Sequence, residues 1–287
     1  MEEAPDRARD FIVRTMTADE VNLAADWAAQ EGWNPGLHDA HCFRAADPNG
    51  FFIGEWRGEP VGSISAVAYD AQFGFIGLYI VRPAFRGKGL GLRMWQHGIE
   101  YLGKRNIGLD GVVAQQPNYR KSGFQLAYRN IRFQGIAEAN ASDNAAWIDV
   151  RQIPFDQLAS YDGRFFPAPR AAFLRAWIDQ PDAVALAHID GGQIRGYGVL
   201  RRCREGRKIG PLFADDEQIA EALFTALVAR CPGERVALDV PEPNPAAVAL
   251  AERYRLTSVF ETARMYTQRA PDLPLTRLYG VTSFELG

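Results

Sequence analysis

The sequence predicts an α/β protein, with helices packed on a mixed sheet, built as two tandem domains. The chain has 287 residues, which suits two domains when a typical domain has roughly 150 residues. Strand-like and helix-like patterns alternate along it. The same order of elements occurs on both sides of a small, polar segment at 136–145, which we interpret as a linker. We therefore expect one domain at 10–135 and a second at 146–287.

The first half begins with a short strand and a helix whose start is marked by a capping box. Thr17 and Glu20 have the spacing at which each side chain bonds the other's backbone N–H. Further on, Pro83 ends a β-prone run because it has no N–H to donate. The elements expected are strands at 11–14, 51–55, 61–69, 76–83, 108–114, 125–129 and 131–134, helices from 17 and from 89, and a loop at 32–43.

The second half repeats this order with different chemistry after its third long strand. The elements expected are strands at 147–153, 183–189, 193–201, 208–211 and 236–240, helices around 171–177, 217–230 and 246–254, and strands to the end. Asp215, Asp216 and Glu217 stand at the start of the 217–230 helix. Carboxylates suit the positive end of a helix dipole as caps, but they repel a phosphate.

A glycine-rich loop after the 76–83 strand has the features of a phosphate site. It carries Arg86, Lys88 and three glycines, which let the backbone approach a ligand closely. The helix that follows offers the free N–H groups of its first turn and the positive end of its dipole. Its apolar residues at helical spacing predict a buried stripe formed by Leu92, Trp95, Ile99 and Leu102.

Two other phosphate loops do not match. A Walker loop needs Gly-Lys-Ser/Thr, whereas Gly89 follows Lys88, and the dinucleotide pattern needs a third glycine where Leu92 stands. Arg86-x-x-Gly89-x-Gly91 instead matches the Arg/Gln-x-x-Gly-x-Gly/Ala loop that holds the coenzyme A pyrophosphate. In this respect the chain resembles the GNAT family of N-acetyltransferases over about residues 10–135. An ordinary strand–turn–helix is the alternative.

The resemblance implies a GNAT fold, which has the order of elements expected here, and an enzyme that uses acetyl-CoA. In the family, the coenzyme bonds to the backbone of a splayed strand end and to the loop and helix that follow. The residues assigned to it on this basis are Tyr79, Ile80, Val81, Arg86, Gly87, Lys88, Gly89, Leu90, Gly91, Leu92 and Asn118. Asn118 could equally be a turn residue after Pro117.

Tyr119 is the general acid that the resemblance implies. In the family a tyrosine lies four residues before a Gly-Phe pair, and its hydroxyl protonates the departing thiolate. Tyr119 has this spacing to Gly123-Phe124. A phenol with a pKa of about 10 holds its proton at neutral pH and can donate it. Because the segment before it is short, a packing role for Tyr119 is the alternative.

The general base is not evident from the sequence. Many GNAT enzymes place a Glu on the fourth strand, where this chain has no carboxylate between 73 and 78. The candidates elsewhere are Asp70, Asp110, His38 and Asp39, besides a water-mediated base, and each could be only a cap, turn or surface charge. The loop at 33–39 lies where the fold shapes the acceptor pocket, or is a rigid connection. The expected substrate residues are Trp33, Asp39, Asp70 and Asp110.

The acidic helix start at 215–217 predicts that the second domain binds no coenzyme and forms a wall of the acceptor pocket or has a structural role. Its ending at 279–287, with Arg264-Met-Tyr upstream, resembles a divergent GNAT domain that follows a standard one in bacterial acetyltransferases. We therefore expect one coenzyme site per chain, in the first domain.

Bulk properties exclude several classes of partner. The net charge is −3 without a basic run, so a nucleic-acid partner is not indicated. Three scattered cysteines give no metal spacing and no disulfide framework, which favours a reducing cytoplasm. The polar N-terminus is unlike a signal peptide, and the apolar runs are too short to span a membrane.

The sequence thus predicts a monomeric or homodimeric, cytoplasmic N-acetyltransferase that moves acetyl from acetyl-CoA to a primary amine of a small molecule by direct attack. The alternatives are a non-catalytic acyl-CoA sensor whose second domain binds a partner, and an enzyme that uses a longer-chain acyl-CoA or an aminoacyl acceptor.

Overall fold

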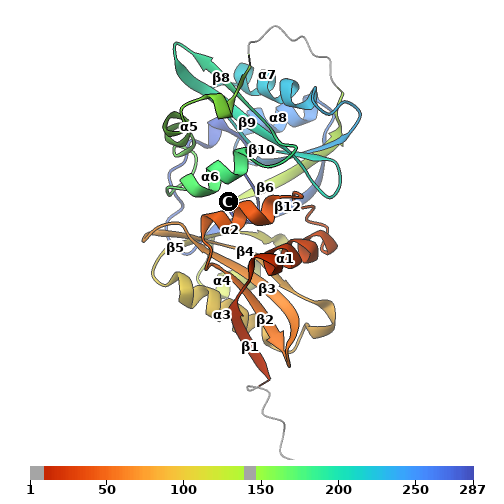
Figure 1. The fold of residues 1–287 in the computed structure, drawn as a ribbon, viewed down its shortest axis with the longest axis vertical. Coiled ribbons are helices and arrows are strands. Elements are labelled where there is room, and N and C mark those ends of the chain that lie inside the picture. The colour runs from red at the N-terminus through yellow and green to blue at the C-terminus, as the bar shows by residue number, and fades with distance from the viewer. Residues whose placement is uncertain (1–9, 139–146) are drawn as a thin grey trace, which may run out of the picture.

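The computed structural model describes residues 10–138 and 147–287, and Figure 1 shows an elongated molecule with one half of the chain at each end. The first half contains β1 (Phe11–Thr15), α1 (Ala18–Gln30), α2 (Asp39–Ala46), β2 (Phe51–Trp56), β3 (Glu59–Ala68), β4 (Phe73–Val81), α3 (Leu90–Leu102), β5 (Asn106–Val112), α4 (Gln116–Lys121) and β6 (Gln125–Ile136). The predicted capping box of Thr17 and Glu20 starts α1.

The second half repeats the alternation of strands and helices. It contains β7 (Ile148–Asp149), α5 (Phe155–Asp162), α6 (Ala171–Ile178), β8 (Val184–Asp190), β9 (Gln193–Arg202), β10 (Arg207–Ala214), α7 (Glu217–Val228), β11 (Arg235–Pro241), α8 (Pro245–Arg253), β12 (Thr257–Tyr266) and β13 (Leu278–Gly280). Within the described residues, no helix is both long and apolar enough to cross a membrane.

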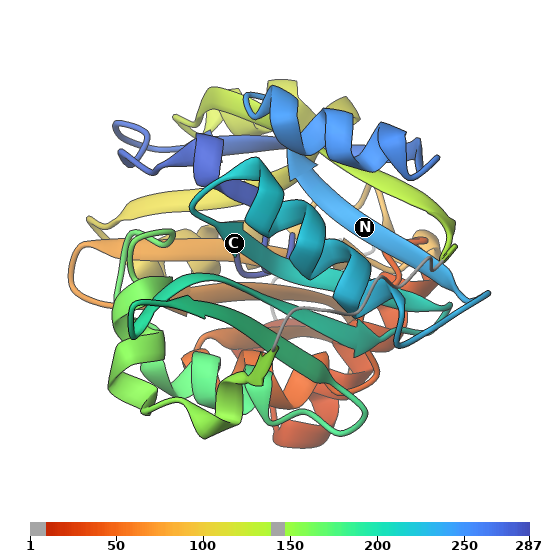
Figure 2. The same cartoon turned by 90° about the horizontal axis from the view of Figure 1, so that it is seen from above.

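All described strands belong to one mixed sheet, so the predicted α/β class is confirmed. Its order is β1-β2-β3-β4-β5-β12-β6-β11-β10-β9-β8-β7, and β13 pairs with β10. The view from above shows helices on both faces of the sheet (Figure 2). The pairs β4·β5 and β10·β11 are parallel, and each is connected through a helix, α3 or α7, as parallel strands require.

The two halves exchange strands at the centre of this sheet. β12 of the second half lies between β5 and β6, whereas β6 of the first half lies between β12 and β11. The predicted linker at 136–145 begins in β6, and its residues from 139 on lie outside the described part. The predicted bounds of the two domains therefore remain a prediction, but neither half completes its own part of the sheet alone.

Some local predictions are wrong. The two strands expected at 125–129 and 131–134 form the single strand β6, because it pairs along its length with β12 and over its second half with β11. The loop expected at 32–43 contains the first residues of α2, and α5 was not predicted. Both helices have fewer than three turns, which gives their apolar residues too little length to show a period.

The buried face of α3 also differs from the predicted stripe. Leu92 is 58% exposed. The buried residues of the helix are Leu90, Met94, Trp95, Gly98 and Leu102. These recur mainly at steps of four from Leu90, so Leu92, two residues further on, points to nearly the opposite side.

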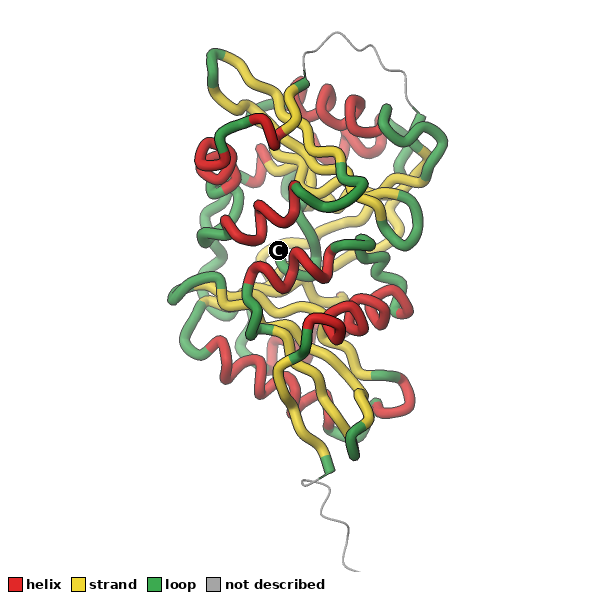
Figure 3. Tube along the Cα trace, viewed as in Figure 1, coloured by secondary structure: helices red, strands yellow, loops and turns green. Residues whose placement is uncertain are grey.

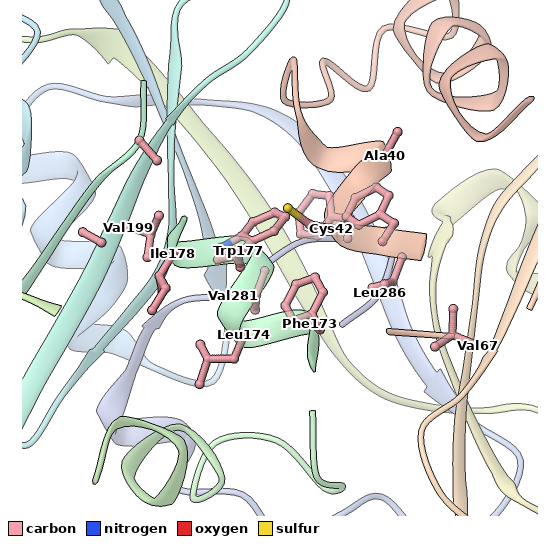
Figure 4. Close-up of a cluster of buried hydrophobic side chains, with 14 of the residues drawn as sticks. Ala40, Cys42, Val67, Phe173, Leu174, Trp177, Ile178, Val199, Val281 and Leu286 are labelled. Carbon is pink, nitrogen blue, oxygen red and sulfur yellow. The ribbon is translucent and has the colours of Figure 1, made fainter. Parts of the chain in front are cut away.

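A large apolar cluster joins the halves where α2 meets α6, which lie side by side (Figure 3). Phe43 of α2 stacks on Trp177 of α6 with ring centroids 6.1 Å apart. The thiol of Cys42 donates to the carbonyl of Ala176 at 3.3 Å. Figure 4 shows Cys42 and Trp177 among apolar side chains from both halves, including Val281 and Leu286 of the C-terminal segment. This burial fixes the halves against each other.

Candidate active site

A cavity lies where β4 and β5 separate. The two parallel strands pair only as far as Ile76 and Leu109, although β4 continues to Val81 and β5 to Val112. Leu78 has a φ of 44°, and the register between β3 and β4 shifts beside it. This bulge turns the end of β4 away from β5, so the backbone beyond Ile76 does not pair with that strand.

The cavity has a volume of about 520 Å³ and is lined by both halves of the chain. It gathers most of the residues that the sequence singled out: Trp33, Tyr79, Ile80, Val81, Arg86, Gly87, Gly89, Leu90, Gly91, Leu92, Asp110 and Tyr119. The second half adds Phe260 and Thr262 from β12, and Phe284 and Glu285 from the C-terminal segment. The site therefore depends on the contact between the halves.

The glycine loop forms a bare cradle at the start of α3. Gly87 and Gly89 have φ values of 74° and 81°, and a Cβ on either would meet no atom within 4 Å. Gly89 is the N-cap of α3 and offers no side chain to its first turn, so the first N–H groups stay available. A Cβ on Gly91 would lie 2.8 Å from the hydroxyl oxygen of Tyr79. The loop therefore presents backbone to an anion, as P-loop-like cradles do.

The two cations of the loop behave differently. Arg86 donates through Nε to the carbonyl of Val81 at 2.7 Å and forms an ion pair with Glu31, which follows α1. It lines the cavity. Lys88 lies over the ring of Phe85, with its Nζ 5.1 Å from the centroid, and is not among the lining residues. Only Arg86 is thus placed to meet an anion in the cradle.

Tyr119 stands on the cavity wall despite the shortness of α4. Its ring lies against Gly111, where a Cβ would come within 2.2 Å of the ring, and 5.5 Å from the ring of Trp95. Burial raises the pKa of Tyr119 to about 12, because the phenolate would lose its hydration. Its hydroxyl makes no hydrogen bond to other described residues. Its hydroxyl is therefore a protonated donor with no hydrogen-bond partner in the described part of the chain.

Besides Lys88, three other residues expected at the site lie elsewhere. Asp39 is fully buried, where it accepts from Arg201 at 2.9 Å and from the N–H of Gly36. Asp70 closes the turn before β4 by accepting two backbone N–H bonds. Asn118 is exposed, lies within α4 and donates to Gln115 at 2.8 Å, so it is a helix residue and not the turn residue of the alternative. All three are absent from the cavity wall.

Trp33 and Asp110 do line the cavity, but partly as structural residues. The carbonyl of Trp33 accepts from Arg132 of β6 at 2.6 Å. Asp110 forms a buried, bidentate ion pair with Arg264 of β12 at 2.9 and 2.6 Å. This pair joins the exchanged strands beside the cavity.

Sequence reasoning missed the four residues that the second half contributes. Glu285 is the only acidic residue of the 281–287 segment, is 3% exposed and lines the cavity. The sequence feature that could have indicated Glu285 is its position as a single carboxylate within 281–287. The exchange of β12 into the first half, which brings Phe260 and Thr262 to the site, left no signal in the order of elements.

Comparisons with known proteins agree with this architecture. A family model described as "Acetyltransferase (GNAT) family" matches residues 18–124, and one described as "Acetyltransferase (GNAT) domain" matches residues 158–280. The holothin acyltransferase of a Pseudoalteromonas species is 31% identical over 272 residues, which is 94% of this chain and 92% of that protein. The chain therefore belongs to the GNAT family, as a tandem member with N-acyltransferase domains.

Two solved structures show the same fold. A candidate acetyltransferase from Pyrococcus horikoshii superposes with a TM-score of 0.83 at 21% identity, covering 100% of this chain and 99% of its own. A tandem GNAT protein from the clavulanic acid biosynthesis pathway gives a TM-score of 0.59 at 12% identity, covering 91% of this chain and 100% of its own. At these identities the likeness concerns the fold.

The family generally uses acetyl-CoA as acyl donor, and the site fits that coenzyme. The bare cradle at Gly87 and Gly89 can accept a pyrophosphate, and Arg86 adds a positive charge. The unpaired end of β4 offers backbone groups to an extended, amide-containing arm. One cavity connects these parts.

Proposed function

We propose that this chain transfers an acyl group, acetyl in the simplest case, from an acyl-CoA thioester to a primary amine of a small molecule by direct attack. One observation carries the proposal: a single cavity contains the glycine cradle, Tyr119 and walls from the second half. These parts correspond to an anion site, an acid for the leaving sulfur and an acceptor pocket, which together can position two reactants.

The coenzyme would be held by the cradle at 86–91 and by the free backbone at the end of β4. When bound, it supplies an acyl group activated as a thioester. Backbone N–H groups near Val81 suit the oxyanion that develops on the acyl oxygen. Lys88 and Asn118 are not included, because they do not line the cavity.

Tyr119 would donate a proton to the departing sulfur. Its hydroxyl keeps its proton because burial raises its pKa, and it has no other hydrogen bond to use among the described residues. A positioned acid of this kind contributes typically about 10²–10⁴-fold to a rate.

The acceptor would lie on the side of the cavity formed by the second half. Trp33, Phe260 and Phe284 supply aromatic surface there, which suits an acceptor with an apolar body. The name of the related holothin acyltransferase is consistent with a small-molecule acceptor. The identity of the amine follows from experiment.

The test is a reaction of the purified chain with acetyl-CoA and a panel of small aromatic and aliphatic amines. We expect an amide product by mass spectrometry and an equal amount of free thiol. Coenzyme binding without any amide product would contradict the proposal and favour a non-catalytic sensor. Repeating the assay with longer acyl-CoA donors measures the chain-length preference.

A further inference from the structure

The residues after β13 pass from the second half to the wall of the cavity. The N–H of Val281 donates to the carbonyl of Asp239 at 2.8 Å. The hydroxyl of Tyr69 donates to the carbonyl of Leu286 at 2.9 Å. A Cβ on Gly77 would lie 1.9 Å from the carbonyl oxygen of Glu285, so a side chain larger than hydrogen does not fit there. Glu285 is thereby held against β4 just beyond the last residue that pairs with β5.

The side chain of Glu285 is a buried carboxylate at the cavity wall. The residue is 3% exposed, and its Oε2 atom is shielded from solvent without a hydrogen-bond partner. Within the described residues, its carboxylate takes part in no hydrogen bond or ion pair. Leaving such a group unpaired costs free energy, so a buried carboxylate without a partner calls for a functional explanation.

Two buried arginines interact electrostatically with Glu285, and both have other carboxylate partners. Arg132 of β6 is bidentate to Asp239 at 2.6 and 2.7 Å. Arg201 of β9 donates through Nε to Asp39, while its two outer nitrogens are buried without partners. Both guanidinium groups donate to other carboxylates, and neither donates a hydrogen bond to Glu285.

The other titratable groups of the cavity wall are less suited to accept a proton. Asp110 is saturated by the bidentate pair with Arg264 and by the amide of Asn130 at 2.8 Å. Glu31 is paired with Arg86. Tyr79 and Tyr119 are phenols whose pKa is raised by burial. Among the described lining residues, Glu285 alone is a carboxylate with no ion pair and no hydrogen bond.

We propose that Glu285 accepts the proton of the acceptor amine, so that the second half supplies a catalytic residue to the site. This rests on the proposed function. Glu285 takes one proton from the ammonium, and the neutral nitrogen then forms the C–N bond to the acyl carbon as the C–S bond breaks. Tyr119 passes the second N–H proton to the sulfur, and Glu285 releases its proton to solvent. No oxidation or reduction occurs.

The test compares Glu285→Gln with the control Glu261→Gln, which removes a surface carboxylate of β12 that pairs with Arg129. For Glu285→Gln we expect turnover at neutral pH to fall on the order of 10²-fold or more. The loss should shrink as the pH approaches the pKa of the amine, because a free amine needs no base. Glu285→Asp, which keeps the carboxylate, should recover part of the turnover.

Two binding measurements do not depend on turnover. Calorimetry should give unchanged coenzyme A affinity for both glutamine variants. Titration of the amine into the coenzyme A complex should show weaker binding by Glu285→Gln than by Glu261→Gln, because the ammonium has lost its anionic partner.

The outcomes separate this role from the proposed function. Equal turnover of the two variants, with amide formed by the wild-type chain, overturns the role of Glu285 and leaves acyl transfer standing. A loss that is the same at every pH, with unchanged amine binding, also overturns it, because a merely structural change has that pattern. No amide from the wild-type chain overturns the proposed function itself.

Discussion

The starts of α3 and α7 occupy corresponding places in the two halves, but only the first is open to an anion. Each helix follows a strand and connects it to a parallel neighbour. At α3 the N-cap is Gly89, which leaves the first turn bare. At α7 the N-cap is Asp216, whose Oδ1 accepts from the N–H of Ile219 at 2.8 Å. The protein's own carboxylate therefore occupies the place of a phosphate in the second half.

Asp215, which precedes the N-cap Asp216, also bonds to other side chains of the second half. It accepts from the hydroxyl of Tyr161 at 2.9 Å and pairs with Arg277, and Arg195 lies 3.5 Å away. The arginines near the start of α7 that could attract a phosphate are therefore already close to the carboxylate of Asp215. The positive end of a helix dipole can therefore bind an anion only where no side chain of the protein already caps the first turn. The second half has the same fold, and it contributes residues of β12 and of the C-terminal segment to the cavity wall.

Gly89→Glu should show the largest effect, because it converts the open start of α3 into an acidic one. The carboxylate would repel pyrophosphate, and a non-glycine residue is strained at φ of 81°. We expect coenzyme A affinity by calorimetry to fall about 100-fold or more, which is at least about 2.7 kcal/mol. Gly58→Glu is the control, since Gly58 has φ of 80° and equal space but lies in the β2–β3 turn. Normal coenzyme binding by folded Gly89→Glu would refute the cradle.

Tyr119→Phe should lower turnover by about 10²-fold, because it removes the proposed donor and keeps the ring. Coenzyme affinity should hold, since a loss confined to the transition state appears in kcat and not in binding. The control is Tyr254→Phe, which removes a hydroxyl bonded to Glu221 in the second half. Unchanged kcat, with chemistry shown to be rate-limiting, would make Tyr119 a packing residue.

The pH profile gives a second check on Tyr119. The proposed role needs the protonated phenol, and burial raises its pKa to about 12. The acid form therefore persists as the pH rises, and turnover should show no loss attributable to this group up to about pH 10. A descending limb near pH 8 to 9 that disappears in Tyr119→Phe would contradict the raised pKa.

Glu31→Gln should have the smallest effect, and in the opposite direction. Glu31 pairs with Arg86 in a partly exposed ion pair, so it competes with a phosphate for that cation. Exposed pairs contribute about 0–1 kcal/mol, so coenzyme affinity should rise about two- to fivefold, and less at high salt. Glu59→Gln, which breaks the exposed pair with Arg82, is the control. Weaker binding by Glu31→Gln would show that Glu31 orients Arg86.

The glycine cradle could be predicted from sequence because it is a local feature. Spacing alone determines that Arg86, Gly89 and Gly91 meet one helix start, and the structure brings all three to the cavity. Tyr119 was predicted for the same reason. Asp39 was misplaced because its partner, Arg201, lies 162 positions away, and no local pattern indicates such a pair.

The acceptor side of the site could not be predicted, because it depends on the strand exchange. Thr262 reaches the cavity only because β12 pairs with β5, where Thr262 is opposite Val112. The order of elements is the same whether a half completes its own sheet or its partner's. Glu285 likewise depends on the contact of its backbone with Gly77.

The most direct test of the central claim, that one of two related helix starts binds coenzyme, is the stoichiometry of coenzyme A binding by calorimetry on the whole chain. We predict about one site per chain, which Gly89→Glu removes, because the acidic start of α7 opposes a phosphate. A stoichiometry near two, or a site that persists in Gly89→Glu, would contradict the account.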